Sequence, residues 1–179
     1  MIAIDQTLLG RFVTLAVERL EGDWVVLGGT VLPLLGIEHR VTLDIDVAGP
    51  ATAGNRELLI LMGIADELGL PVETINQAAT YFLHRVPDWP ALLVPLQTSD
   101  KASVLRPNAT LFIQLKLARL SEADLSDCLH MLGFARRTSE VVDLTRLRLV
   151  LDQQTAAGCS AGRLARLGTL RDALGEEGR

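Results

Sequence analysis

Two short apolar runs joined by a glycine turn constrain the fold of this chain more than any other feature. The first run, residues 24–27, leads into Gly28 and Gly29, and the second, residues 41–47, alternates apolar and polar side chains. Alternation with a period of two is typical of a half-buried strand, so both runs are predicted to be β-strands. The residues expected on the buried face of the second strand are Val41, Leu43, Ile45 and Val47.

The opposite face of the second strand carries two carboxylates, Asp44 and Asp46, with Thr42. Like charges so close together repel each other unless a cation compensates them, and magnesium is bound by one or two carboxylates together with substrate phosphates. The turn at Gly28, Gly29 and Thr30 opens a short helix over residues 30–35, and a helix N-terminus attracts anions such as phosphate. The alternatives are a solvated polar strand face beside Arg40 and an ordinary turn.

The remaining pattern predicts an α/β (α+β) fold. A small mixed sheet flanked by helices is expected in residues 1–107, and a helical subdomain packed on it in residues 108–179. A third strand over residues 91–97 contains Pro95, which favours an edge strand or a bulge. Asn55 and Asn108 are expected to cap helices, and Gly133 to end one. The other helices are predicted over residues 5–20, 56–68, 71–85, 108–120, 121–133, 138–153 and 160–174.

The composition of the chain argues against some classes of protein. The 179 residues are 49% apolar and carry a net charge of −5, which argues against broad nonspecific nucleic-acid binding. Residues 136–179 nevertheless hold eight arginines against six acids. Their expected role is a solvated helix face or a contact to phosphate. The longest apolar stretch, residues 25–37, is broken by glycines and a proline, so no membrane span is expected. Cys128 and Cys159 are far apart, and no secretory signal is evident, which favours a reduced, cytoplasmic location.

The glycine turn, the short helix and the Asp-x-Asp strand together resemble the signature of the nucleotidyltransferase superfamily that includes DNA polymerase β. The run Arg40-x-Thr42-x-Asp44-Ile45-Asp46 is similar to that of bacterial members, among them uncharacterised nucleotidyltransferase-like proteins and the toxins of abortive-infection toxin–antitoxin systems. A second stretch resembles their helical hairpin: residues 115–119 read Leu-Lys-Leu-Ala-Arg and are followed by Asp124 and Asp127.

The resemblance implies a magnesium-dependent transfer of a nucleoside monophosphate from a nucleoside triphosphate to a hydroxyl acceptor. Asp44 and Asp46 would hold the metal, Gly28, Gly29 and Thr30 would contact the phosphates, and Lys116 and Arg119 would bind the triphosphate. The toxin-like members suggest RNA, such as a transfer RNA end, as acceptor and an antitoxin protein as partner. A small molecule or a protein hydroxyl is the other class of acceptor.

Two departures keep an alternative open. The spacer of 14 residues between the glycine motif and the first aspartate exceeds the usual range of the family, and the expected third strand, residues 91–97, carries no acid. A third acid would have to be Asp100, Asp124 or Asp127. Without one, the chain is a catalytically degenerate binding module, whose apolar surface would suit an oligomer. Lys116, Arg119, Asp124 and Asp127 would then be an ion-pair cluster between two helices.

Overall fold

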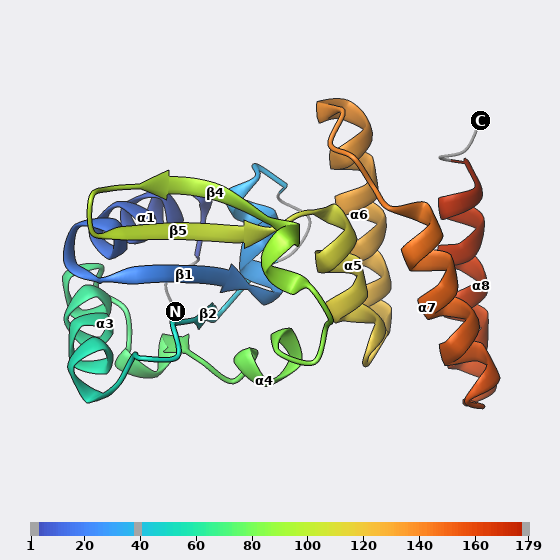
Figure 1. Ribbon diagram of the computed structural model, residues 1–179, viewed down its shortest axis with the longest axis horizontal. Coiled ribbons are helices and arrows are strands. Elements are labelled where there is room, and N and C mark those ends of the chain that lie inside the picture. The colour runs from blue at the N-terminus through green and yellow to red at the C-terminus, as the bar shows by residue number, and fades with distance from the viewer. Residues whose placement is uncertain (1–3, 38–40, 177–179) are drawn as a thin grey trace. The chain divides into compact units, whose positions relative to one another are not determined.

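A computed structural model describes residues 4–37 and 41–176 and divides the chain into two compact units, Met1–Pro107 and Asn108–Arg179. The first unit contains a five-stranded mixed sheet with helices, and the described residues of the second unit form helices but no strand (Figure 1). The predicted α+β fold class is therefore confirmed. In the described residues, no helix is both long and apolar enough to cross a membrane.

The sheet has the strand order β3-β2-β1-β5-β4. β1 pairs antiparallel with β2 and parallel with β5, while β2 pairs parallel with β3 and β4 pairs antiparallel with β5. The register of β4 shifts between Pro95 and Gln97, and β4 lies at one edge, so both features that Pro95 predicted are present. The strands are β1 Gly22–Leu27, β2 Ile45–Ala48, β3 Ile75–Asn76, β4 Leu93–Thr98 and β5 Ala102–Pro107.

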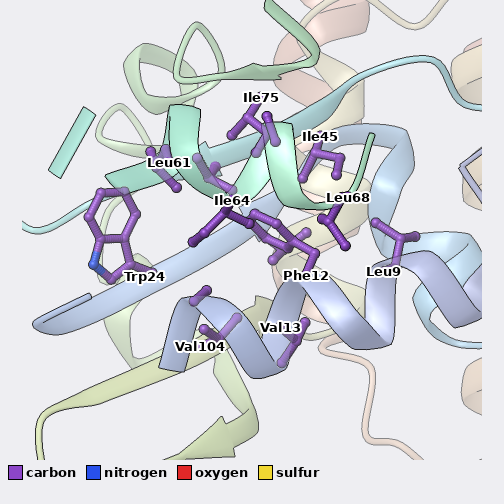
Figure 2. Packing of buried hydrophobic residues seen from close by; sticks show 14 of the residues in the cluster. Leu9, Phe12, Val13, Trp24, Ile45, Leu61, Ile64, Leu68, Ile75 and Val104 are labelled. Atoms are coloured by element: carbon purple, nitrogen blue, oxygen red, sulfur yellow. The ribbon is translucent and has the colours of Figure 1, made fainter. Parts of the chain in front are cut away.

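Helices α1 and α3 share one apolar cluster with the strands, in which Phe12 of α1 and Ile64 of α3 are almost inaccessible to solvent (Figure 2). Ile45 of β2 and Ile75 of β3 point into the same cluster. The helical segments of this unit are α1 Gln6–Arg19, η1 Gly28–Thr30, α2 Val31–Leu34, α3 Asn55–Glu67, η2 Val72–Thr74, α4 Thr80–Leu83 and η3 Trp89–Leu92.

The strand that carries the acids begins later than predicted. Ile45 and Val47 are buried as expected, but Val41 and Leu43 are 67% and 50% exposed and lie before β2. The antiparallel register explains the difference. Asp46 is opposite Leu27, the last residue of β1, so residues before Ile45 run past the end of their partner strand. Arg40 lies outside the described residues.

Two other predictions in this unit were wrong, and one strand was missed. Residues 71–85 are not one helix but η2, β3 and α4, because Ile75 and Asn76 pair with β2 and therefore have an extended backbone. Strand β5 was not predicted. The N-cap of α3 is Gly54, whose N–H donates to Glu57 Oε2 at 2.8 Å, rather than Asn55.

The second unit contains four helices within its described residues. α5 contacts α6 and α7, and α8 contacts α6 and α7, so the four form a bundle. Asn108 caps α5 as predicted, since its side chain accepts the N–H of Leu111. Gly133 does not end α6, because buried Met131, Leu132 and Ala135 around it outweigh the small helix cost of one glycine. The helices are α5 Ala109–Leu117, α6 Glu122–Thr138, α7 Leu144–Ala156 and α8 Ala161–Glu176.

Candidate functional site

The turn after β1 packs directly against one of the two predicted acids. Gly28 has φ +63°, a backbone conformation that residues with a Cβ rarely adopt. A Cβ at this position would lie only 3.0 Å from Cγ of Asp46 and closer still to its carboxylate oxygen. Glycine is therefore required at position 28 both by the backbone and by the approach of the Asp46 side chain.

Thr30 ties the same turn to the segment that carries both acids. Its side chain is fully buried, and its hydroxyl donates to the backbone oxygen of Asp44 at 2.9 Å. The N–H of Asp46 in turn donates to Thr30 Oγ1 at 3.4 Å. These bonds take the place of strand pairing where the acid-bearing segment passes beyond β1. The structure thus makes Thr30 a link between turn and acids, while its predicted contact to phosphate stays a prediction.

The two acids occupy different environments. Asp46 is half-buried on β2, opposite Leu27, and Asp44 is exposed immediately before the strand. Because Ile45 and Val47 point into the apolar cluster, Asp46 projects from the other face of the sheet. The structure therefore brings Gly28, Thr30 and Asp46 together and holds Asp44 next to them through its backbone.

One polar residue beside this site was not identified from the sequence. Asn76 of β3 pairs with Asp46, and its neighbour Ile75 pairs with Ile45. A strand of two residues is too short to show an alternating pattern, so the sequence contained no signal by which β3 could be separated from the residues around it.

The donor set at this turn suits a hard divalent cation. Among the described residues, no group of three or more histidines, cysteines or acids could hold a metal ion. Two aspartates with phosphate oxygens from a substrate are, however, the usual way in which magnesium is bound. Asp44 and Asp46 offer carboxylates of that kind, and the absence of a Cβ at position 28 leaves the space that the Asp46 carboxylate itself occupies.

The second predicted motif forms an ion cluster in the α5–α6 hairpin, in which both aspartates are buried. Lys116 Nζ lies 3.2 Å from Asp124 Oδ1 and 2.7 Å from Asp127 Oδ2. Arg119 binds Asp124 with two nitrogens, at 2.7 and 2.9 Å. Ser121 forms the predicted capping box, because its hydroxyl accepts the N–H of Asp124 while the Asp124 carboxylate accepts the N–H of Ser121.

The surroundings of Asp124 favour its ionised form. Burial by itself would raise the pKa of this carboxyl, but hydrogen bonds from Arg119 and Ser121 and the charge of Lys116 outweigh it. The pKa of Asp124 consequently lies well below its ordinary value of 3.8. Burial also raises the pKa of the nearby Cys128 thiol well above 9.0, so this thiol remains protonated at neutral pH.

The arrangement is the one expected of an ion-pair cluster between two helices. Asp124 and Asp127 are 1% and 0% exposed, and the Lys116 side chain is 11% exposed. Lys116 therefore pairs with both aspartates, while Arg119, whose side chain is 76% exposed, pairs with Asp124. Their predicted contacts to a triphosphate, and a third acidic role for Asp124 or Asp127, remain predictions that this local geometry does not require.

Most of the arginines in the tail are engaged within the second unit. Arg163 donates to the backbone oxygens of Leu117, Ala118 and Arg119, and Arg166 donates to that of Leu120 at 2.7 Å. Together they satisfy carbonyl groups at the end of α5 and in the turn that follows it. Four more bind groups of the same unit: Arg136 and Arg148 donate to the backbone oxygens of Ala173 and Leu174, and Arg146 and Arg171 donate to the side chains of Gln114 and Asp152.

Comparison of the chain with known protein families, with curated proteins and with solved structures finds no match.

Proposed function

We propose that this protein is a magnesium-dependent nucleotidyltransferase whose site is the turn at Gly28 and the acids Asp44 and Asp46. The observation that carries the proposal is the contact of the Asp46 side chain with Gly28, reinforced by the two hydrogen bonds of Thr30. A carboxylate held against a glycine turn gives a cation and a phosphate adjacent places to bind. The type of reaction is inferred from the resemblance of the sequence motifs to those of nucleotidyltransferases.

In the proposed reaction, a hydroxyl oxygen of the acceptor attacks the α-phosphorus of a nucleoside triphosphate. A new O–P bond forms, the bond from the α-phosphorus to the bridging oxygen breaks, and pyrophosphate leaves with that electron pair. The hydroxyl proton is released to solvent. Asp44 and Asp46 would hold magnesium, which when bound stabilises negative charge on the attacking and leaving oxygens. The backbone at Gly28 and Gly29 would position the triphosphate, so the protein contributes mainly orientation and charge.

The resemblance extends this proposal to the acceptor and the setting. RNA, such as a transfer RNA end, is the proposed acceptor, with an antitoxin as protein partner and the cytoplasm as location. The arginine contacts within the second unit argue for a limited RNA surface, because six arginines of the tail already bind groups of their own unit.

The test is incubation of the protein with labelled nucleoside triphosphates, magnesium and total RNA. We expect label on RNA with the wild-type protein and a loss of at least about 100-fold in Asp46→Asn, since removal of one metal-binding carboxylate removes several kcal/mol of transition-state stabilisation. Asp23→Asn is the matched control, because Asp23 is an exposed acid at the opposite end of β1. Labelling that survives Asp46→Asn contradicts the proposed site.

A second candidate function is a nucleotidyltransferase-like binding module without turnover. It is favoured by β3, which presents the neutral Asn76 rather than an acid next to Asp46. Thermal unfolding with magnesium and each nucleoside triphosphate separates the two. A shift that Asp46→Asn abolishes, without transfer of label to any acceptor, supports the module.

A further inference from the structure

Asn76 lies on the same face of the sheet as Asp46. The two residues are directly paired between parallel strands, as are Ile45 and Ile75 one position earlier. Both isoleucines belong to the apolar cluster, as Figure 2 shows. Since side chains alternate along a strand, Asp46 and Asn76 both project away from that cluster.

The side-chain oxygen of Asn76 accepts one backbone hydrogen bond. The side chain is half-buried, and its Oδ1 accepts the N–H of Ala78 at 3.2 Å. This bond uses one of two lone pairs on the oxygen, so the same atom can also coordinate a cation. Amide oxygens are ordinary ligands of hard divalent ions.

The neutrality of this side chain limits the charge of the site. A carboxylate at position 76 would place a third negative charge beside Asp46, which is two residues from Asp44 along the chain. Three such charges repel one another in the absence of a metal and attract a bare divalent cation strongly once it is present. Two aspartates and an amide attract a bare divalent cation less strongly. This suits a cation that binds together with the phosphates of a nucleotide.

We propose that Asn76 is a neutral third oxygen ligand of the cation site formed by Asp44 and Asp46, and that its lack of charge keeps the affinity of this site for a bare divalent cation low. This inference rests on the proposed function, because it concerns the same site. It concerns binding of the metal alone, however, and can be tested without any acceptor or turnover.

The experiment measures binding of Mn²⁺ alone to the full-length protein by the electron paramagnetic resonance signal of the free ion. Asn76→Asp keeps the oxygen that accepts the Ala78 N–H and adds one charge, so it is expected to bind Mn²⁺ at least about tenfold more tightly than the wild type. Asn76→Ala removes the oxygen and is expected to bind several-fold more weakly. Asn55→Asp is the control, since it adds the same charge at an exposed position of the same unit. Circular dichroism establishes that each variant is folded.

The outcomes separate the inference from the proposed function. If Asn76→Asp binds Mn²⁺ no more tightly than Asn55→Asp, or Asn76→Ala binds it as the wild type does, the role of Asn76 is overturned. If Asp46→Asn still weakens binding in the same assay, the site of the proposed function stands. If Asp46→Asn binds Mn²⁺ as the wild type does, both the site and the role of Asn76 are overturned.

Discussion

At the scale of single residues, the candidate site depends on the absence of one side chain and the presence of one hydroxyl. Gly28 permits the approach of Asp46, and Thr30 fastens the backbone on both sides of Ile45. The sequence predicted a turn at Gly28 and a contact of this residue with phosphate. Its close contact with Asp46 depends on the register of β1 and β2, which brings Leu27 opposite Asp46.

Gly28→Ala should destabilise the protein. Alanine at this position must adopt a positive φ, and its methyl group must displace the Asp46 carboxylate. We therefore expect a loss of at least about 2 kcal/mol in the free energy of unfolding. Urea denaturation measures it. Gly10→Ala in α1 is the control, because no other atom lies within 4 Å of its added Cβ, and it should be stabilising by up to about 1 kcal/mol. Equal stabilities of the two variants would show that Asp46 does not pack against this turn.

At the scale of elements, the α5–α6 hairpin was predicted from its charged residues and its capping box, and both are present. The sequence left open whether the charges serve a ligand or the hairpin itself. Burial provides the physical basis for preferring the second role, because two carboxylates removed from water must be compensated by neighbouring cations. Lys116 and Arg119 provide that compensation.

Lys116→Met should therefore lower the free energy of unfolding, whether or not this lysine has a role in catalysis. It leaves Asp127 and Asp124 with less compensation in a buried position, and a cost of about 3–5 kcal/mol is expected. Chemical denaturation at neutral pH is the measurement. Lys101→Met serves as a control at the other lysine of the chain, which is exposed, and should change stability by less than about 0.5 kcal/mol. A Lys116→Met protein as stable as the wild type would favour a ligand-binding role for this lysine.

The ionised state of Asp124 predicts a loss of stability in acid. Its pKa is lowered in the folded protein, so the unfolded chain takes up the proton first as the pH falls. The stabilisation is complete above the ordinary value of 3.8 and is lost progressively below it. Urea unfolding between pH 7 and pH 2 should show this loss in the wild type, and a flatter profile in Asp124→Asn, which should also be less stable at pH 7. Asp152→Asn, at an exposed ion pair with Arg171, should retain the wild-type profile.

At the scale of the whole molecule, the chain comprises an α+β unit and a helical unit that each have their own buried residues. The helical unit has a core that includes Leu147, Leu151, Leu167 and Leu170, all at most 1% exposed. A fragment of residues 108–179 should therefore be helical and unfold cooperatively when monitored by circular dichroism. A fragment without a cooperative transition would show that this core is insufficient alone.

Elements with a repeated local pattern could be predicted from the sequence, whereas short strands could not. α1 was located almost to the residue, since its apolar positions repeat several times. The predictions for α6 and α7 were less accurate: α6 continues to Thr138 rather than ending at Gly133, and α7 begins at Leu144 rather than at Thr138. β3 was taken for part of a helix, and β5 was not detected. β3 has only two residues, and β5 pairs with β1, which is distant in the chain. The local sequence pattern does not reveal pairing between distant strands.

The sequence by itself determined the class of the fold, the glycine turn, the pair of aspartates and the charged hairpin, because each is expressed in residues close together along the chain. Only the tertiary structure decided which residues meet. It put Asp46 against Gly28, placed Asn76 beside Asp46, and paired Lys116 with buried aspartates. The physical reason is that strand register and burial arise from contacts between distant segments, and these contacts set both the position and the charge of each side chain.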